Sequence, residues 1–220
     1  LGDSHSIDIY NSISKLSRKD EFIVGLNVAG CRPTQNSTDE CHYDNALKFI
    51  ETFNASIKYI FFTHKGSYFL TNIGGKKDIS SSKLRKLPLN FNQINDTIDY
   101  LKKIKQINSN LIFIGPHIEP NINYNFKTLK NFLENNFQDR SNYDLIKVDE
   151  ELKNVSKLNQ INYISKIDIL NFKFEKDFIV DGNLTFSDTD HWSEYGEVYF
   201  GKKLIFNSMI RDILFAENLN

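Results

Sequence analysis

Apolar residues recur every three or four positions in several stretches of the chain, which is the spacing of one face of an α-helix. The clearest stretch spans residues 91–107, where Ile94, Ile98, Leu101 and Ile104 share one helical face. The same period predicts further helices over residues 6–19, 44–53, 126–137, 150–158 and 193–216.

Short apolar runs lie between these helices and predict β-strands. They cover residues 21–27, 57–63, 111–114, 144–148 and 161–169, while 31–41 and 67–89 are expected to be loops. Strands that alternate with helices build a mainly parallel sheet with helices on both faces. We therefore predict the α/β class, with three layers (α/β/α) and a mainly parallel central sheet.

Composition supports one domain over residues 1–220, because 40% apolar residues in 220 suffice for one sizeable core. The 27 Lys and Arg nearly balance the 28 Asp and Glu, so we expect no nucleic-acid partner. The longest apolar runs, such as 59–62, are far shorter than the roughly 18 residues of a membrane helix. No signal-peptide pattern opens the sequence, so any export must be specified by residues outside it.

Two short polar motifs at opposite ends of the chain could carry chemistry. Residues 2–5 (GDSH) place Ser4 just before a helix, whose N-terminal N–H groups stabilise a developing negative charge. Asp188 stands three residues before His191, so it can bind one imidazole nitrogen while the other nitrogen acts as a base. Either motif alone also fits an ordinary helix N-cap.

Together the two motifs resemble the ends of the SGNH, or GDSL, hydrolase superfamily, in which a serine comes first and Asp-x-x-His last. The resemblance implies that Ser4 is the nucleophile, His191 its general base and Asp188 the residue that orients His191. It also implies a flavodoxin-like fold, and we expect no cofactor. Asp190 fits the family spacing less well than Asp188.

Further motifs resemble one branch, the SGNH domains fused behind integral-membrane acyltransferases that O-acetylate bacterial surface polysaccharides such as lipopolysaccharide. The shared features are GDSH, a Cys-x-Pro with a second Cys, an apolar strand before a polar turn, Gly-Pro-x-x-x-Pro and DxDH. They stand at residues 2–5, 31–41, 60–68, 115–120 and 188–191.

That branch implies an acyl donor and a polysaccharide acceptor as partners, and an upstream membrane acyltransferase portion in a longer chain. It also implies an extracytoplasmic location, periplasmic or at the cell surface, with tethering to the membrane through residues outside this sequence. The abrupt start of the chain at residues 2–5, with no strand before the motif, agrees with that expectation.

The two cysteines, Cys31 and Cys41, are separated by nine residues rich in Pro, Asn, Ser and Thr. This spacing permits a small disulfide loop, which an exported location favours, and two independent free thiols are the alternative. With His42 they supply three metal ligands at best, in an order unlike zinc sites, and the histidines lack metal-binding spacings. We expect no metal.

The superfamily commonly completes its oxyanion hole with a glycine and an asparagine. Gly30 is our candidate for the glycine, because residues 25–27 (GLN) come too early and fall inside a predicted strand. The branch tends to have a Ser-Ala-Arg-Trp-like stretch after the cysteine loop, whereas this chain has Thr63, His64 and Lys65. These three are therefore oxyanion or substrate candidates, and no asparagine is assigned.

Several other candidates have two interpretations. His64 and Lys65 follow a predicted central strand, where α/β sheets bind ligands, or they end a strand in solvent. His117 is a substrate contact or a loop residue, and Trp192 stacks on a sugar ring or anchors the last helix. The Lys-rich residues 76–86 attract an anionic glycan or form a solvated loop.

The leading hypothesis is acyl transfer through a covalent serine intermediate, with a sugar hydroxyl as acceptor. The same three residues with water as acceptor give a carbohydrate O-acetyl esterase or a lipase. A non-catalytic glycan-binding module is the alternative outside the enzymes, since a fold does not imply an activity. The presence of all three triad residue types argues against that module.

Overall fold

The computed structural model describes residues 1–16, 22–33, 41–71, 87–120, 139 and 141–215. Two sequence-based expectations, a helix over 126–137 and a charged segment over 76–86, lie outside the described residues. The helices are α1 (Ser4–Leu16), α2 (Tyr43–Phe53), α3 (Phe91–Ile107), α5 (Asp144–Leu158), α6 (Lys166–Leu170), α7 (Phe174–Asp177), α8 (Glu194–Ile205) and α9 (Ser208–Phe215), with short 3-10 helices η2 (Asn54–Ser56) and η3 (Gly66–Phe69). The strands are β1 (Ile60–Thr63), β2 (Leu111–Ile114), β3 (Asn162–Ile164), β4 (Ile179–Val180) and β5 (Asn183–Leu184).

The central sheet is parallel and has the order β1-β2-β3. Gly2 extends it by single parallel bridges to Thr63 of β1 and to Asn27. Across the sheet the order is thus Asn27, Gly2, β1, β2, β3, which is the flavodoxin-like order 2-1-3-4-5. The predicted α/β class with a parallel central sheet is confirmed.

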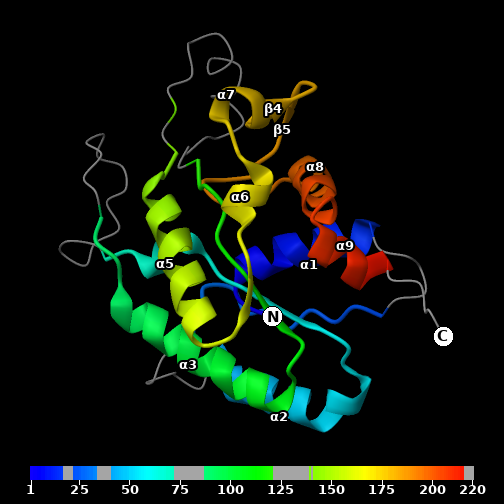
Figure 1. Ribbon diagram of the computed structural model, residues 1–220. Coiled ribbons are helices and arrows are strands. Elements are labelled where there is room, and N and C mark those ends of the chain that lie inside the picture. Colours follow the sequence, from blue (N-terminus) through cyan, green and yellow to red (C-terminus); the bar gives the residue numbers. More distant parts are fainter. Residues whose placement is uncertain (17–21, 34–40, 72–86, 121–138, 140, 216–220) are drawn as a thin grey trace.

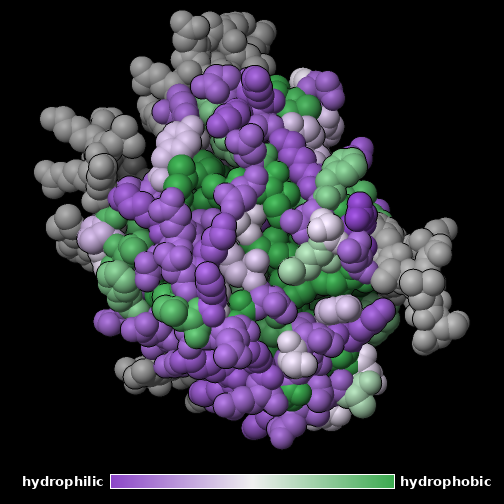
Figure 2. Space-filling view, viewed as in Figure 1, coloured by the Kyte–Doolittle hydropathy of each residue, from purple (hydrophilic) through white to green (hydrophobic). Residues whose placement is uncertain are grey.

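Helices cover both faces of this sheet. In Figure 1, α2, α3 and α5 lie on one side, and α1, α8 and α9 lie on the other. All four residues of β2 are buried, because the central strand of a parallel sheet is covered on both faces. The outer surface is mainly hydrophilic on the face shown in Figure 2, with apolar side chains in smaller patches.

The helix α3 has the predicted bounds and buries its apolar stripe, and Asn90 caps it by accepting a hydrogen bond from the N–H of Gln93. None of the helices among the described residues combines the length and the apolar character needed to cross a bilayer.

The strand predicted over 144–148 is wrong, because helix α5 already begins at Asp144. Leu145, Val148 and Leu152 recur at helical spacing and are buried together, so one amphipathic helix explains both this segment and the helix predicted over 150–158. The strand predicted over 161–169 is too long. It ends at Ile164, because Ser165 caps helix α6.

Two other predictions needed correction, and one hairpin was not predicted. Within the predicted strand 21–27, of which the structure describes residues 22–27, Asn27 is the only described residue that forms a β-bridge. The long C-terminal helix is two helices, because Asn207 interrupts it and accepts a hydrogen bond from the N–H of Ile210 in α9. The hairpin β4–β5 was not predicted, although its turn carries Asp181-Gly182 with positive φ at both residues.

Cys31 and Cys41 are joined by a disulfide, with their Cα atoms 5.4 Å apart. The bridge links the chain just after the Gly2–Asn27 pairing to the segment before α2. The N–H of Val28, three residues before Cys31, donates to the carbonyl of Gly2, so the disulfide follows closely after the segment that pairs with the turn carrying Ser4.

Candidate active site

The turn that carries Ser4 is built around Gly2. Its φ is +146°, and a Cβ there would lie 1.9 Å from the carbonyl oxygen of Thr63, so only glycine fits. The buried Asp3 then fixes the turn, since Oδ1 accepts from the N–H of His5 at 2.9 Å and Oδ2 from the N–H of Lys65 at 3.0 Å. Ser4 is thereby held at the first position of α1, beside the carboxyl end of β1.

Ser4, His191 and Asp188 form a continuous hydrogen-bonded chain. Ser4 Oγ lies 2.7 Å from His191 Nε2, and His191 Nδ1 lies 2.7 Å from Asp188 Oδ2. The second oxygen of Asp188 accepts from the backbone N–H of Asp190 and of His191, at 2.9 and 2.7 Å. Because a carboxylate only accepts, Nδ1 of His191 carries a proton and Nε2 of the neutral ring is free to accept from Ser4.

This geometry sets the acid–base properties of the pair. The hydrogen bond to Asp188 raises the pKa of His191 to about 9, against the opposing effect of burial, and the charges of Asp190 and Asp8 add to the increase. Burial alone would raise the pKa of Asp188, but the hydrogen bond from His191 holds it below its usual value. The arrangement therefore stabilises an imidazolium next to a carboxylate.

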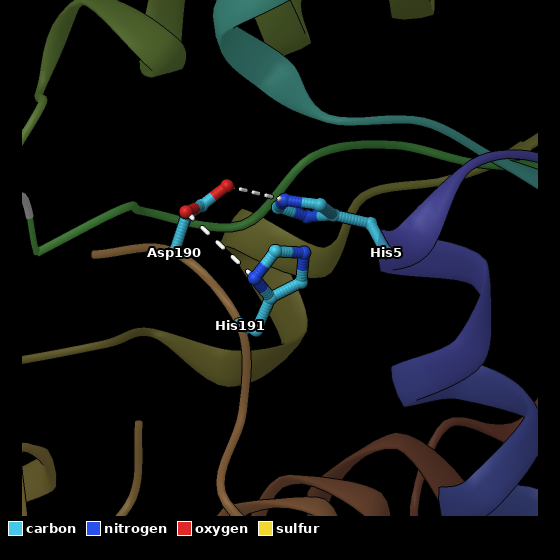
Figure 3. Close-up of side chains that lie close together, drawn as sticks. All are labelled: His5, Asp190 and His191. Carbon is cyan, nitrogen blue, oxygen red and sulfur yellow. Dashed lines mark hydrogen bonds and ion pairs between the residues drawn. The ribbon is translucent and has the colours of Figure 1, made fainter. Parts of the chain in front are cut away.

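Asp190 is the centre of a second, buried cluster. Its Oδ2 accepts from His5 Nε2 at 3.0 Å and from the ammonium of Lys65, and its Oδ1 accepts from the hydroxyl of Thr189 at 2.7 Å. Its backbone carbonyl accepts from His117 Nε2 at 2.9 Å. Figure 3 shows Asp190 facing the rings of both His5 and His191, with one dashed contact to each.

The polar atoms of His5, Asp190 and His191 lie within 4.8 Å of one another, close enough to share a metal ion. However, the ammonium of Lys65 already contacts Asp190, and both ring nitrogens of His191 are engaged by Ser4 and Asp188. A metal would have to displace these partners. We therefore assign no metal to this cluster.

Beneath the site lies a buried Lys–Asp combination that sequence reasoning missed. Lys166 follows β3, is fully buried, and donates to Thr63 Oγ1 at 3.3 Å. Asp8 of α1 accepts from the backbone N–H of Trp192 at 3.2 Å. Burial lowers the pKa of Lys166 to about 8 and raises that of Asp8 to about 6. The sequence signal for this combination was Asp8, an acidic residue on the buried face of the helix predicted over 6–19.

Two of the strand-end candidates are buried rather than open to substrate. The His64 ring is hydrogen-bonded to the Tyr43 hydroxyl at 2.7 Å, and burial lowers its pKa to about 4. The hydroxyl of Thr63 accepts a hydrogen bond from the ammonium of the buried Lys166. Lys65 differs from both, since its side chain is 25% exposed.

The remaining candidates likewise include buried residues and an exposed one. Trp192 is 3% exposed and packs on His117 and Phe200, which favours the packing anchor over a sugar platform. His117 is buried as well. Gly30 lies in an exposed turn with φ +73°, two residues after Val28, whose N–H donates to the carbonyl of Gly2.

Comparison with known proteins places this geometry in a family context. A family model described as "SGNH domain (fused to AT3 domains)" matches residues 1–205. No curated protein sequence matches the chain significantly.

Solved structures share the fold at low sequence identity. The periplasmic domain of a lipopolysaccharide acetyltransferase from Salmonella ser. Paratyphi A has a TM-score of 0.67 at 21% identity, covering 95% of this chain and 81% of that one. A carbohydrate acetylesterase family member from Sinorhizobium meliloti has a TM-score of 0.53 at 8% identity, covering 99% and 97%. At these identities the likeness concerns the fold alone.

Proposed function

The chain belongs to the family of SGNH domains that are fused to AT3 domains, and we propose that it is a serine-dependent O-acyltransferase with Ser4, His191 and Asp188 as its catalytic triad. The observation that carries the proposal is the hydrogen-bonded chain from Ser4 Oγ through both ring nitrogens of His191 to Asp188. The three residues come from opposite ends of the sequence, so their contact is a property of the fold rather than of local capping.

In the proposed reaction, His191 Nε2 takes the proton of Ser4 while Oγ attacks the carbonyl carbon of an acyl donor. Collapse of the tetrahedral intermediate transfers that proton to the leaving group and leaves an acyl ester on Ser4. His191 then deprotonates the acceptor hydroxyl, which attacks the acyl ester and regenerates the serine. Asp188 holds the ring in the required tautomer throughout.

The oxyanion requires donors near Ser4. The N–H of Ser4 itself stands at the first position of α1, where helix N–H groups lack intrahelical acceptors. Gly30, in the turn beside the Gly2 pairing, is the proposed second donor. Removing one such donor typically costs about 3 kcal/mol of transition-state stabilisation.

We propose an acetyl group as the acyl group and a hydroxyl of a bacterial cell-surface polysaccharide as the acceptor. The family's fusion to AT3 domains supports transfer, as does the fold shared with a periplasmic lipopolysaccharide acetyltransferase domain. The same considerations favour an upstream membrane acyltransferase portion and an extracytoplasmic, membrane-tethered location. The fold shared with a carbohydrate acetylesterase supports O-acetyl ester hydrolysis as the second candidate.

The test of the triad uses a serine-reactive fluorophosphonate. We expect it to label the purified protein, Ser4→Ala to abolish labelling, and Ser14→Ala on the exposed side of the same helix to leave labelling unchanged. With p-nitrophenyl acetate, Ser4→Ala and His191→Ala should each reduce kcat by orders of magnitude, and the double variant should lose little more. If Ser4→Ala keeps more than about a tenth of kcat, the covalent mechanism is wrong and a binding module is favoured.

A second experiment separates transfer from hydrolysis. The protein is incubated with an acetyl donor and candidate glycans, with and without an AT3 membrane partner, and products are analysed by mass spectrometry. Acetylated glycan supports the transferase. Free acetate with unmodified glycan under every condition supports the esterase.

A further inference from the structure

Asp190 and Asp188 are two residues apart but lie in opposite environments. The side chain of Asp188 is 51% exposed, and its hydrogen bonds stay within residues 188–191. The side chain of Asp190 is 5% exposed, and its partners outside the loop come from α1, from the end of β1 and, through its carbonyl, from the end of β2. Asp190 therefore ties the loop that carries His191 to three parts of the core.

Asp190 also brings a charge close to His191. Its Oδ1 lies 3.9 Å from His191 Nδ1, and its other carboxylate oxygen, Oδ2, contacts the ammonium of Lys65. His5 contacts the same carboxylate through Nε2 at 3.0 Å, and its ring centroid lies 5.0 Å from that of His191. The carboxylate is thus shared between a fixed cation and the proposed catalytic base.

We propose that Asp190 is a positioning residue for His191, and that the Lys65–Asp190 pair sets the basicity of that histidine. The inference rests on the proposed function, because it concerns the general base of the same site. Lys65 partly neutralises Asp190, so the field of this pair at His191 is that of a carboxylate oxygen 3.9 Å from Nδ1, reduced by the ammonium that contacts the other carboxylate oxygen. Removing either member changes that difference in a known direction.

Other charges around His191 must stay constant for this argument to hold. The titratable groups that face it or its immediate partners are Asp188 on the same loop, His5 and Asp8 on α1, His117 and Glu119 after β2, and Lys166 on α6. None of them is altered in the variants below.

The two single variants should move the pKa of His191 in opposite directions. Asp190→Asn removes the near anion and leaves Lys65 uncompensated, so the pKa falls. Lys65→Met leaves Asp190 uncompensated, so the pKa rises. For Asp190, a unit charge 3.9 Å from Nδ1 in a well-screened site corresponds to a fall of roughly 0.5 to 1 unit, and the rise in Lys65→Met should be smaller because Lys65 acts from the far oxygen of Asp190. The double variant should lie between Asp190→Asn and the parent, since it lacks both the near anion and the cation that partly compensates it.

The experiment is an NMR pH titration of the His191 ring in a Ser4→Ala background, with the signal assigned by its loss in His191→Gln. Asp99→Asn, an exposed carboxylate on α3, is the charge-matched control and should shift nothing. Equal shifts, or no shift, in Asp190→Asn and Lys65→Met would overturn the inference. If Asp190→Asn fails to fold, an unmoved or lowered pKa in Lys65→Met is sufficient to overturn it.

This readout needs no turnover, so the two proposals fail separately. If the fluorophosphonate does not label the parent protein, the proposed function is rejected, while the NMR shifts of His191 remain interpretable. An active enzyme whose His191 does not respond to Asp190 and Lys65 would reject only the positioning role. In an active protein, the acid limb of kcat/KM should follow the same opposite shifts, which a purely structural contact would not produce.

Discussion

Replacing Gly2 by alanine should break the parallel bridge between Gly2 and Thr63 of β1, which positions Ser4. The new Cβ would meet the backbone oxygen of Thr63 at 1.9 Å, and a backbone atom cannot rotate away as a flexible side chain can. The segment must therefore move by about 1 Å before the contact reaches a tolerable separation of roughly 3 Å. Such a movement disturbs the pairing of Gly2 with both Thr63 and Asn27.

The cost follows from the contacts that are lost. Gly2 donates to the carbonyl of Leu26 and accepts from the N–H of Val28, and each such bond contributes about 1 kcal/mol net. Backbone strain at a glycine-only conformation adds about 1–3 kcal/mol. Together we expect a loss of about 3–5 kcal/mol in the free energy of unfolding, or about 6–20 °C in Tm for a chain of this size.

Gly30→Ala is the matched control, because Gly30 also has positive φ but a Cβ there would meet no atom within 4 Å. Only left-handed strain of about 1–2 kcal/mol should appear, which is about 2–8 °C in Tm. Its N–H is retained, so the proposed oxyanion donor survives. A displacement of about 1 Å at Ser4 should slow fluorophosphonate labelling of Gly2→Ala by about 100-fold.

Thermal unfolding by circular dichroism and the labelling rate measure both effects. The reasoning is refuted if Gly2→Ala melts and reacts like the parent protein. It is also refuted if Gly30→Ala is destabilised as strongly as Gly2→Ala, because the steric difference between the two positions would then have no consequence.

Four further predictions concern the charges and the disulfide. Because Asp188 raises the pKa of His191 to about 9 and the base must be neutral, kcat/KM should rise with pH along a limb centred near pH 9. The stability that the His191–Asp188 pair contributes should be complete below about pH 6.5 and lost as pH rises through 9, visible as a fall in Tm that His191→Ala lacks. Reduction of Cys31–Cys41 should lower the free energy of unfolding by about 2–3 kcal/mol in denaturant titrations, and an unchanged midpoint would contradict this. Asp188→Asn should reduce kcat less than His191→Ala, because Asp190 lies 3.9 Å from the same ring nitrogen, and Asp188→Asn with Asp190→Asn should remove the remainder.

The layer order of the fold could be predicted because helical and strand periods are local properties. Helix α3 and strand β2 have the predicted bounds, since each carries an uninterrupted pattern. The errors occur where tertiary contacts decide. Residues 144–148 are short and apolar, which fits a strand or one buried helical face equally, and only packing selects the helix. Asn27 pairs with Gly2, whose N–H donates to the carbonyl of Leu26, but no other described residue of the predicted strand forms a β-bridge.

In the site, too, local motifs could be predicted from the sequence, whereas roles that depend on tertiary contacts could not. The order of Ser4 and Asp188-x-x-His191 was sufficient to select three residues that the fold brings into contact across the chain. The roles of Asp190 and Lys65 could not be read in this way, because a DxDH motif does not say which carboxylate faces solvent and which faces the core. That distinction depends on the contacts of one loop with Lys65, which follows β1, and with His5 of α1, and both contacts span long sequence separations. Burial of a carboxylate is favourable only where such partners converge, so the tertiary fold decides which of the two aspartates is buried.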